Sequence, residues 1–528
     1  MVAINKYSSK LKVWSVEMPN APYSNRWEQF KKMKIINALN RIGIVGILLL
    51  GFSSCRNSES INSYSTIAIT GVNIIDMVDG TVSSNMTIII KENVISEIGL
   101  TEKLEPPKQA KILNASGKYA IPGLWDMHAH TSSDSITREI LFPTFIANGV
   151  TGIRNMIADC YDNEDRPCAH LGIEMLNIER SRKIQEDVAT GRLIGPRTIL
   201  GSALVMGPEP GKPSTVQDPG TTEHGRQHVK FLMERGVDFI KVYNPLPREA
   251  YFGIAEEAKK QGLPIEGHIP DAIKASEASD AGQKSIEHCC MGNLFEECST
   301  REEELKQKIM ELWESDVPKG VYEVFLELVK SYDDTKCQAI YQKFIENGTW
   351  FVPTLIVGEL HQPNTLHWKD DPRLKYVPRK EVHYWSENET YYKKFGVVDP
   401  LIRQKRFEMV RDMNKAGVNL LAGSDCGEVS VFWGSGLHDE LELLVEAGLT
   451  ELEALQAATL KPAEFENLSD SLGNIKKGML ADLILLDANP LENISNTQRI
   501  FSVIANGKYF DRLTLDGILD KVEIEAAK

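Results

Sequence analysis

Residues 123–130 read Gly-Leu-Trp-Asp-Met-His-Ala-His, an apolar strand that ends in two histidines. Seven further segments share this design, in which a short apolar run leads into a polar loop: 150–156, 197–205, 237–243, 264–268, 285–289, 350–356 and 418–425. Amphipathic stretches with apolar residues at helical spacing separate the strands, as at 224–235, 248–261 and 403–415. Glycines close the helix before six of these strands: Gly149, Gly236, Gly262, Gly282, Gly348 and Gly417.

Eight strand-and-helix units predict an α/β protein built on a closed (β/α)8 TIM barrel, because right-handed crossovers place successive parallel strands side by side. An open doubly wound sheet produces the same alternation, but the count of eight favours closure. At 528 residues, with 42% hydrophobic and 25% charged residues, the chain has room for a barrel and one smaller domain.

Short strands with turns flank the barrel on both sides. Residues 67–99 indicate hairpins with turns at Asp79-Gly80 and Glu92-Asn93, and 481–487 and 503–509 supply strands after the barrel. Neither half can bury its apolar face alone, so we expect them to combine into one small β-sandwich domain. The predicted organisation is an N-terminal extension and signal peptide at 1–55, a tether at 56–64, a first half-domain at 65–121, the barrel at 122–465 and a second half-domain at 466–528.

Two insertions interrupt the barrel repeat. Residues 297–346 are charged and predicted to be helical, and 358–400 are rich in tryptophan, tyrosine and histidine. Loops that follow barrel strands surround the active face. The aromatic insertion is therefore a candidate substrate cover, and a small satellite core is the alternative.

Ionisable or metal-binding side chains end five of the predicted strands: His128, His130, Lys241, His268, His288 and Asp425. Residues two apart on a strand point to the same face, so both histidines of the first strand can share one metal ion. Singly, each residue has a structural explanation, such as a hydrogen-bonded histidine or a helix-capping aspartate. Their recurrence at the carboxyl ends of strands, where barrel enzymes keep their chemistry, predicts a metal site.

Lys241 is an unexpected member of this set, because an ammonium group repels a divalent cation. A desolvated lysine loses its proton and can react with CO₂ to form a carbamate, whose two oxygens can bridge two metal ions. Lys241 therefore favours a centre of two divalent ions that activates a water molecule. Imidazole and carboxylate ligands suit zinc best, with manganese, cobalt or iron as other choices. An unmodified lysine in the barrel wall is the alternative.

The stretch Ile-Pro-Gly-Leu-Trp-Asp-Met-His-Ala-His at 121–130 resembles the opening motif of the amidohydrolase superfamily, and Gly-Ser-Asp at 423–425 resembles its closing motif. Residues 436–441, 454–459 and 478–483 are similar to the imidazolonepropionase-like and prolidase-like branch. The resemblance covers residues from about 65 to 510.

This resemblance implies a ligand set and a mechanism. The residues implied to hold one metal ion are His128, His130 and Asp425, those for the other ion are His268 and His288, and the bridge is a carboxylated Lys241. Asp425 is also the implied general base, which takes a proton from the bridging hydroxide and delivers it to the leaving group. Tyr243, on the same strand face as Lys241, is either a donor to the developing oxyanion or a packed wall residue.

Two positions depart from the family pattern. Cys426 follows the closing aspartate where many relatives have Ser, and Asn155 ends the second strand where Asp is usual. Neither position is a predicted ligand, so the departures concern substrate specificity.

The N-terminal region resembles a bacterial lipoprotein signal. Lysines and an arginine precede the apolar run 42–52, which is shorter than the roughly 20 residues of a membrane-spanning helix, and Phe52-Ser53-Ser54-Cys55 follows. We expect Cys55 to become the lipidated first residue of an exported protein, held at a bacterial membrane by lipid alone. A signal peptide cleaved nearby without lipid is the alternative, and translation starts at Met1 or Met33.

The net charge limits the possible binding partners, and the cysteine content limits the possible disulfides. The net charge of −15 argues against a nucleic-acid partner, whose phosphates attract clustered lysine and arginine. The seven cysteines after Cys55 include no CxxC pair, so we expect no disulfide scaffold. Cys160 and Cys168 can pair in an oxidising compartment or stay as free thiols.

The sequence thus predicts hydrolysis of a carbon–nitrogen bond in a small molecule or dipeptide: an amide, a cyclic amide or a dipeptide ending in proline. Lactone, phosphotriester and deamination chemistry are alternatives on the same site. A surface lipoprotein that binds without turnover is a third class, which a missing ligand would indicate, and all six ligands are present.

Overall fold

The computed structural model describes residues 64–160, 169–170, 173–288, 293–313, 320–359, 365–392 and 398–528. The predicted extension, signal peptide, Cys55 and most of the tether lie outside these residues, as does Cys168. Among the described helices, none combines the length and the apolar character needed to cross a membrane.

Eight parallel segments close into a barrel. Three of its strands pair in one ladder: β6 (Leu124–Ala129), β7 (Val150–Asn155) and β10 (Arg197–Leu200). Four pair in another: β11 (Ile240–Val242), β12 (Ile265–Gly267), β13 (Ser285–Glu287) and β14 (Trp350–Val352). Bridges from Gly201 to Phe239 and from Val205 to Val242 join the two ladders.

The eighth segment, 418–425, completes the ring without forming a continuous ladder of its own. Leu420 bridges to Phe351 of β14, and Cys426, just past the segment, bridges to Ala129 of β6. The amide of Met127 also donates to the carbonyl of Ala422 at 2.9 Å. The eighth segment therefore pairs with both β14 and β6, which closes the ring. The predicted closed barrel is confirmed, and the open sheet is excluded.

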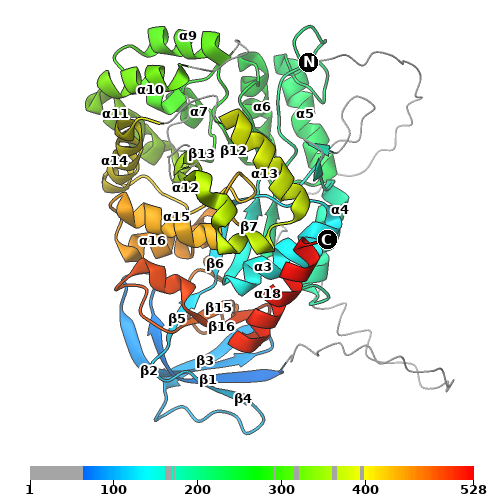
Figure 1. Ribbon diagram of the computed structural model, residues 1–528, viewed down its shortest axis with the longest axis vertical. Coiled ribbons are helices and arrows are strands. Elements are labelled where there is room, and N and C mark those ends of the chain that lie inside the picture. The colour runs from blue at the N-terminus through cyan, green and yellow to red at the C-terminus, as the bar shows by residue number, and fades with distance from the viewer. Residues whose placement is uncertain are drawn as a thin grey trace, which may run out of the picture. The chain divides into compact units, whose positions relative to one another are not determined.

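Helices alternate with the barrel strands, as the apolar periodicity predicted (Figure 1). They are α2 (Asp134–Ile136), η1 (Thr137–Leu141), α3 (Phe142–Ala147), α4 (Ile178–Ala189), α5 (Thr222–Arg235), α6 (Arg248–Gln261), α7 (Ala275–Asp280), α14 (Pro400–Ala416), α15 (Ser435–Glu446), α16 (Glu451–Ala457) and α17 (Leu460–Phe465). A short pair, β8 (Ala169–His170) and β9 (Ile173–Glu174), precedes α4. All six glycines predicted to end helices have φ between 68° and 95°, the left-handed region that such ends require.

The flanking segments form one sheet, in the order β17-β16-β15-β5-β1-β2-β3 with β4 beside β1. Its strands before the barrel are β1 (Thr66–Ile75), β2 (Val82–Lys91), β3 (Val94–Leu100), β4 (Lys111–Asn114) and β5 (Tyr119–Pro122), and those after it are β15 (Leu483–Leu486), β16 (Ile500–Ala505) and β17 (Lys508–Asp511). The two halves meet where β15 pairs with β5, as seen at the lower end of Figure 1. The sheet has its own apolar core, which includes Ile67, Ile88 and Leu483.

The predicted union of the two halves is therefore present, but a β-sandwich is not confirmed, because the pairing gives one continuous sheet and not two facing sheets. Helix η5 (Ile494–Gln498) lies between β15 and β16. The C-terminal helix α18 (Arg512–Ala526), which was not predicted, packs against α3, and its buried Leu515 and Val522 belong to the same apolar core as the barrel.

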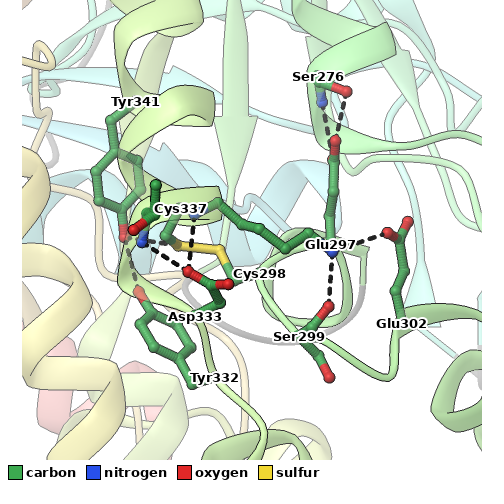
Figure 2. Close-up of a disulfide and its surroundings, with 11 residues drawn as sticks. Ser276, Glu297, Cys298, Ser299, Glu302, Tyr332, Asp333, Cys337 and Tyr341 are labelled. Carbon is green, nitrogen blue, oxygen red and sulfur yellow. Dashed lines mark hydrogen bonds and ion pairs between the residues drawn. A yellow bond between two sulfur atoms is a disulfide. The ribbon is translucent and has the colours of Figure 1, made fainter.

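The charged insertion is helical, as predicted. It contains α9 (Glu302–Trp313), α10 (Val321–Lys330) and α11 (Asp334–Asn347), and α8 (Asn293–Glu297) precedes it. Cys298 forms a disulfide with Cys337 of α11 (Figure 2). The sequence did not predict this bond, because a spacing of 39 residues carries no signal until the two cysteines are brought together by the fold. Cys160 is disulfide-bonded as well, and the predicted Cys160–Cys168 pairing involves a residue outside the described set.

The aromatic insertion contains α12 (Leu355–Glu359), η2 (Thr365–Asp370), η3 (Pro372–Tyr376) and α13 (Arg379–Tyr392). Trp385 of α13 is fully buried, with its ring 5.4 Å from those of Trp368 and Phe432 and stacked at 6.3 Å on Trp433. These rings belong to the same apolar core as the barrel, so they do not form a separate satellite core. The same cluster holds α13 in place.

Candidate metal centre

All six predicted ligands lie at the same end of the barrel. His128 is the second-last residue of β6, and His130 directly follows that strand. Lys241 lies in β11, and His268 and His288 directly follow β12 and β13. Asp425 ends the eighth segment. Because the strands are parallel, their carboxyl ends meet at one rim, and this is why residues almost 300 positions apart converge.

The four imidazoles form a connected cluster. Ring centroids are 5.3 Å apart for His128 and His130, 4.7 Å for His128 and His288, and 4.6 Å for His268 and His288. Ligand atoms of His128, His288 and Asp425 all lie within 4.8 Å of one another, close enough to hold one metal ion.

Asp425 is the centre of this cluster. Its Oδ1 lies 2.8 Å from Nε2 of His130 and 3.4 Å from Nε2 of His128, and its Oδ2 lies 3.7 Å from Nδ1 of His288. Burial works to raise the pKa of Asp425, but the hydrogen bond with His130 and the positive charges nearby outweigh it and lower the pKa. Asp425 is therefore a carboxylate at neutral pH, as a metal ligand or a proton acceptor must be.

Lys241 is buried, and its Nζ has no hydrogen-bond partner. Burial lowers its pKa to about 8, partly offset by the negative charges of Glu287 and Asp425. An orphaned, easily deprotonated amine at the floor of a ligand cluster is costly in a protein interior unless another group completes it.

Two glycines make room for these side chains. A Cβ on Gly267 would lie 2.4 Å from the carbonyl oxygen of Val242 and 3.0 Å from Cδ of Lys241. A Cβ on Gly423 would lie 2.7 Å from the backbone nitrogen of His128. The backbone of the closing segment can therefore approach the first strand only because residue 423 has no side chain.

Two of the ligands have unusual backbone conformations. His288 has a φ of 68° and Asp425 a φ of 60°. Non-glycine residues in this left-handed region cost about 1 kcal/mol or more and persist where surrounding structure imposes them, which is common at functional sites. Both residues leave a strand at this point, and the turn aims the side chain across the barrel mouth.

Three of the histidines have a second partner at Nδ1. The partners are Glu287 Oε2 for His128 at 2.9 Å, Asn244 Oδ1 for His268 at 2.5 Å and Thr354 Oγ1 for His288 at 2.8 Å. Such contacts orient an imidazole. For His128, the contact at Nδ1 leaves Nε2 on the side of Asp425. Burial, followed by the charge on Lys241, lowers the pKa values of His128 and His268 well below the usual range, and burial lowers that of His288 to about 4.

The donor set fits divalent cations. Neutral imidazoles and an ionised carboxylate are the forms that bind metal. The residues that would hold the ions thus meet at one rim, and burial favours the neutral forms of His128, His268 and His288.

Tyr243 follows β11 and packs against His268, with ring centroids 4.4 Å apart. Burial, with the nearby charges of Glu428 and Asp425, raises the pKa of its phenol. Tyr243 therefore keeps its proton at neutral pH and can act as a hydrogen-bond donor beside the ligands.

Helix α13 of the aromatic insertion lies against the loops that carry the ligands. The Trp385 Nε1 donates to the carbonyl of Gly427, two residues after Asp425, at 2.9 Å. The hydroxyl of Ser132, two residues after His130, donates to Glu381 of α13 at 2.9 Å. These two bonds and the buried rings around Trp385 thus hold α13 at the barrel mouth.

Charged residues inside the barrel were missed at the sequence level. Arg154, Glu266 and Glu287 are buried in β7, β12 and β13, and Arg154 donates to both carboxylates. The available signal was their occurrence in strands expected to be buried on both faces, because a buried charge requires a partner.

Comparisons with known proteins agree with this arrangement. The chain matches the amidohydrolase family over residues 119–509. Ochratoxinase from Aspergillus niger is 23% identical over 486 residues, a match that covers 82% of this chain and 84% of that protein. Among solved structures, a Xaa-Pro dipeptidase with methionine bound in its active site has a TM-score of 0.58 at 21% identity and covers 85% of this chain and 100% of its own.

Bottromycin amidohydrolase has a TM-score of 0.66 at 19% identity, with 88% of this chain and 91% of that chain covered. At these identities the structural likeness shows the fold. The family match extends over most of the sequence and includes every predicted ligand. The chain therefore belongs to the amidohydrolase family and is an enzyme that hydrolyses amide bonds.

Proposed function

We propose that this protein uses two divalent metal ions, for which zinc is best suited, to hydrolyse an amide, a cyclic amide or a dipeptide ending in proline. The observation that carries the proposal is the cluster of four imidazoles and Asp425 at one barrel mouth, with the buried, unpartnered Nζ of Lys241 in β11. The names of the similar proteins, a Xaa-Pro dipeptidase and bottromycin amidohydrolase among them, support substrates of the peptide or amide class.

The proposed ligands divide into two groups. His128, His130 and Asp425 would hold one ion and His268 and His288 the other, and Lys241, as a carbamate, would supply a further ligand. Its lowered pKa and its lack of a partner support the carbamate, since only a neutral amine reacts with CO₂. Bound divalent ions would lower the pKa of a water molecule and polarise the substrate carbonyl.

The protein's own groups then move the proton and hold the substrate. Asp425 accepts the proton of the attacking water and donates it to the leaving nitrogen, a role suited to a carboxylate with a lowered pKa. Tyr243 donates its hydroxyl proton in a hydrogen bond to the carbonyl oxygen as negative charge develops there. Helix α13 limits the access of bulk water at the mouth.

Metal analysis of the purified protein tests the proposal. We expect close to two divalent ions per chain and turnover of at least one member of a panel of acyl-amino acids, dipeptides ending in proline, cyclic amides and lactones. Metal-free protein that stays inert after zinc addition would overturn the proposal. Turnover of lactones alone would reassign the reaction to ester chemistry.

Replacement of Asp425 tests its proton transfer. We expect Asp425→Asn to lower kcat by about 10²- to 10⁴-fold, the usual contribution of a general acid–base group. Asp516→Asn changes an exposed carboxylate on α18 and serves as the matched control. Steady-state kinetics on the best panel substrate, with metal content measured in parallel, separates loss of the proton acceptor from loss of an ion. Unchanged kcat in Asp425→Asn would remove Asp425 from the mechanism.

We also propose that the protein is exported and anchored by lipid on Cys55. Disulfides at Cys298–Cys337 and at Cys160 support an oxidising compartment, because disulfides are rare in reducing cytosol. Labelled palmitate fed to expressing cells should enter the wild-type protein and not Cys55→Ser. Equal labelling of both would exclude Cys55 as the acylated residue.

A further inference from the structure

Glu287 directly precedes His288 in the chain, but its side chain contacts a different predicted ligand, His128. Its Oε2 is 2.9 Å from Nδ1 of His128, and both side chains are buried from solvent. A carboxylate can only accept a hydrogen bond, so Nδ1 of His128 carries the ring proton. The other nitrogen, Nε2, is left with its lone pair toward Asp425, on the metal side of the ring.

Arg154 holds Glu287 in this position. One terminal nitrogen of its guanidinium donates to both carboxylate oxygens of Glu287, at 2.9 Å each. The other terminal nitrogen donates to Glu266 at 2.7 Å and to Ser285 at 2.9 Å. A carboxylate fixed through both oxygens cannot rotate away from the imidazole.

Arg154 also forms a hydrogen bond with β6, the strand that carries His128. Its Nε donates to the carbonyl oxygen of Met127, the residue before His128, at 2.6 Å. Arg154 is fully buried and links β6, β7, β12 and β13. The backbone and the ring of His128 are therefore positioned by one buried group.

We infer that Glu287, locked by Arg154, is a positioning residue that sets the tautomer of His128 and strengthens its Nε2 as a metal ligand. The inference rests on the proposed metal centre and adds to it a residue that binds neither metal nor substrate. Carboxylates that accept from a ligating histidine raise its basicity, and their loss weakens metal binding by about 10- to 100-fold.

The test compares Glu287→Gln with Glu266→Gln in zinc-binding titrations of metal-free protein against a chromophoric chelator. Both substitutions remove one buried carboxylate from Arg154 and leave it the other, but only Glu287 touches His128. We expect zinc to bind about 10- to 100-fold more weakly to Glu287→Gln, and Glu266→Gln to stay within about threefold of wild type. Thermal unfolding of the metal-free proteins shows whether the two variants are equally destabilised.

Glu287→Asp is the second variant, because it keeps a charge for Arg154 while it withdraws the carboxylate from His128. It should fold and still bind zinc more weakly than Glu266→Gln. Equal zinc affinities for the Glu287 and Glu266 variants would overturn the positioning role. Wild-type protein that binds no zinc would overturn the metal centre itself and this inference with it, a result distinct from wild-type binding that the Glu287 variants do not change.

Discussion

At the scale of single residues, burial decides which side chains can hold a charge. His228 of α5 is buried, and its Nδ1 donates to the carbonyl of Val216 at 2.6 Å. Burial lowers the pKa of His228 to about 4, from 6.5 in an exposed chain. Between these values the unfolded chain takes up a proton and the native protein does not. The free energy of unfolding is therefore largest above pH 6.5 and falls as the pH drops toward 4.

A variant that cannot titrate isolates this effect. We expect the wild type to lose about 2 kcal/mol more stability than His228→Gln between pH 7 and pH 5, because glutamine keeps a donor for Val216 and takes up no proton. Urea unfolding of both proteins at the two pH values measures the difference. Parallel losses in the two proteins would show that His228 is not protonated on unfolding in this range.

At the scale of elements, α13 depends on one side chain for its place at the barrel mouth. Trp385 contributes a buried ring to the cluster with Trp368, Phe432 and Trp433, and its Nε1 bonds to Gly427. Besides the contacts of Trp385, the described residues of α13 make one hydrogen bond to the loops that carry the ligands, between Glu381 and Ser132. Removal of the ring should therefore loosen the helix without opening the barrel.

We expect Trp385→Ala to cost about 3–5 kcal/mol locally and to speed proteolysis within residues 379–392, while metal content is unchanged. Trp385→Phe keeps most of the ring contacts and loses only the hydrogen bond, at a cost of about 1 kcal/mol. Limited proteolysis followed by mass spectrometry identifies the cleaved bonds. Identical cleavage in the wild type and Trp385→Ala would show that other contacts hold α13.

At the scale of the whole molecule, the barrel and its insertions are stabilised in different ways. Most residues of the barrel strands are buried, and their apolar side chains belong to a large core. The insertion between β13 and β14 adds a covalent link, Cys298–Cys337, which closes a loop of 39 residues. In the chain-entropy description, such a crosslink is worth about 4 kcal/mol.

We expect Cys298→Ser with Cys337→Ser to raise amide hydrogen exchange within 293–313 and 320–347 and to leave exchange in the barrel strands unchanged, because the crosslink closes a loop inside the insertion. Hydrogen exchange read by mass spectrometry resolves the two regions. Uniformly faster exchange over the whole chain would show that the insertion and the barrel unfold together.

The sequence by itself determined most of the elements and the candidate ligands. Apolar periodicity and glycine spacing are local properties, and they predicted the eight barrel segments. Ionisable residues at the ends of five of these segments then predicted one shared site, since the carboxyl ends of parallel strands meet at one rim. Only the tertiary structure revealed four features: the continuous sheet, the helix α18, the Cys298–Cys337 bond and the position of α13. Arg154 and Glu287 show why: they are 133 residues apart, and their bond depends on the register of β7 against β13 across the barrel, which no local pattern specifies.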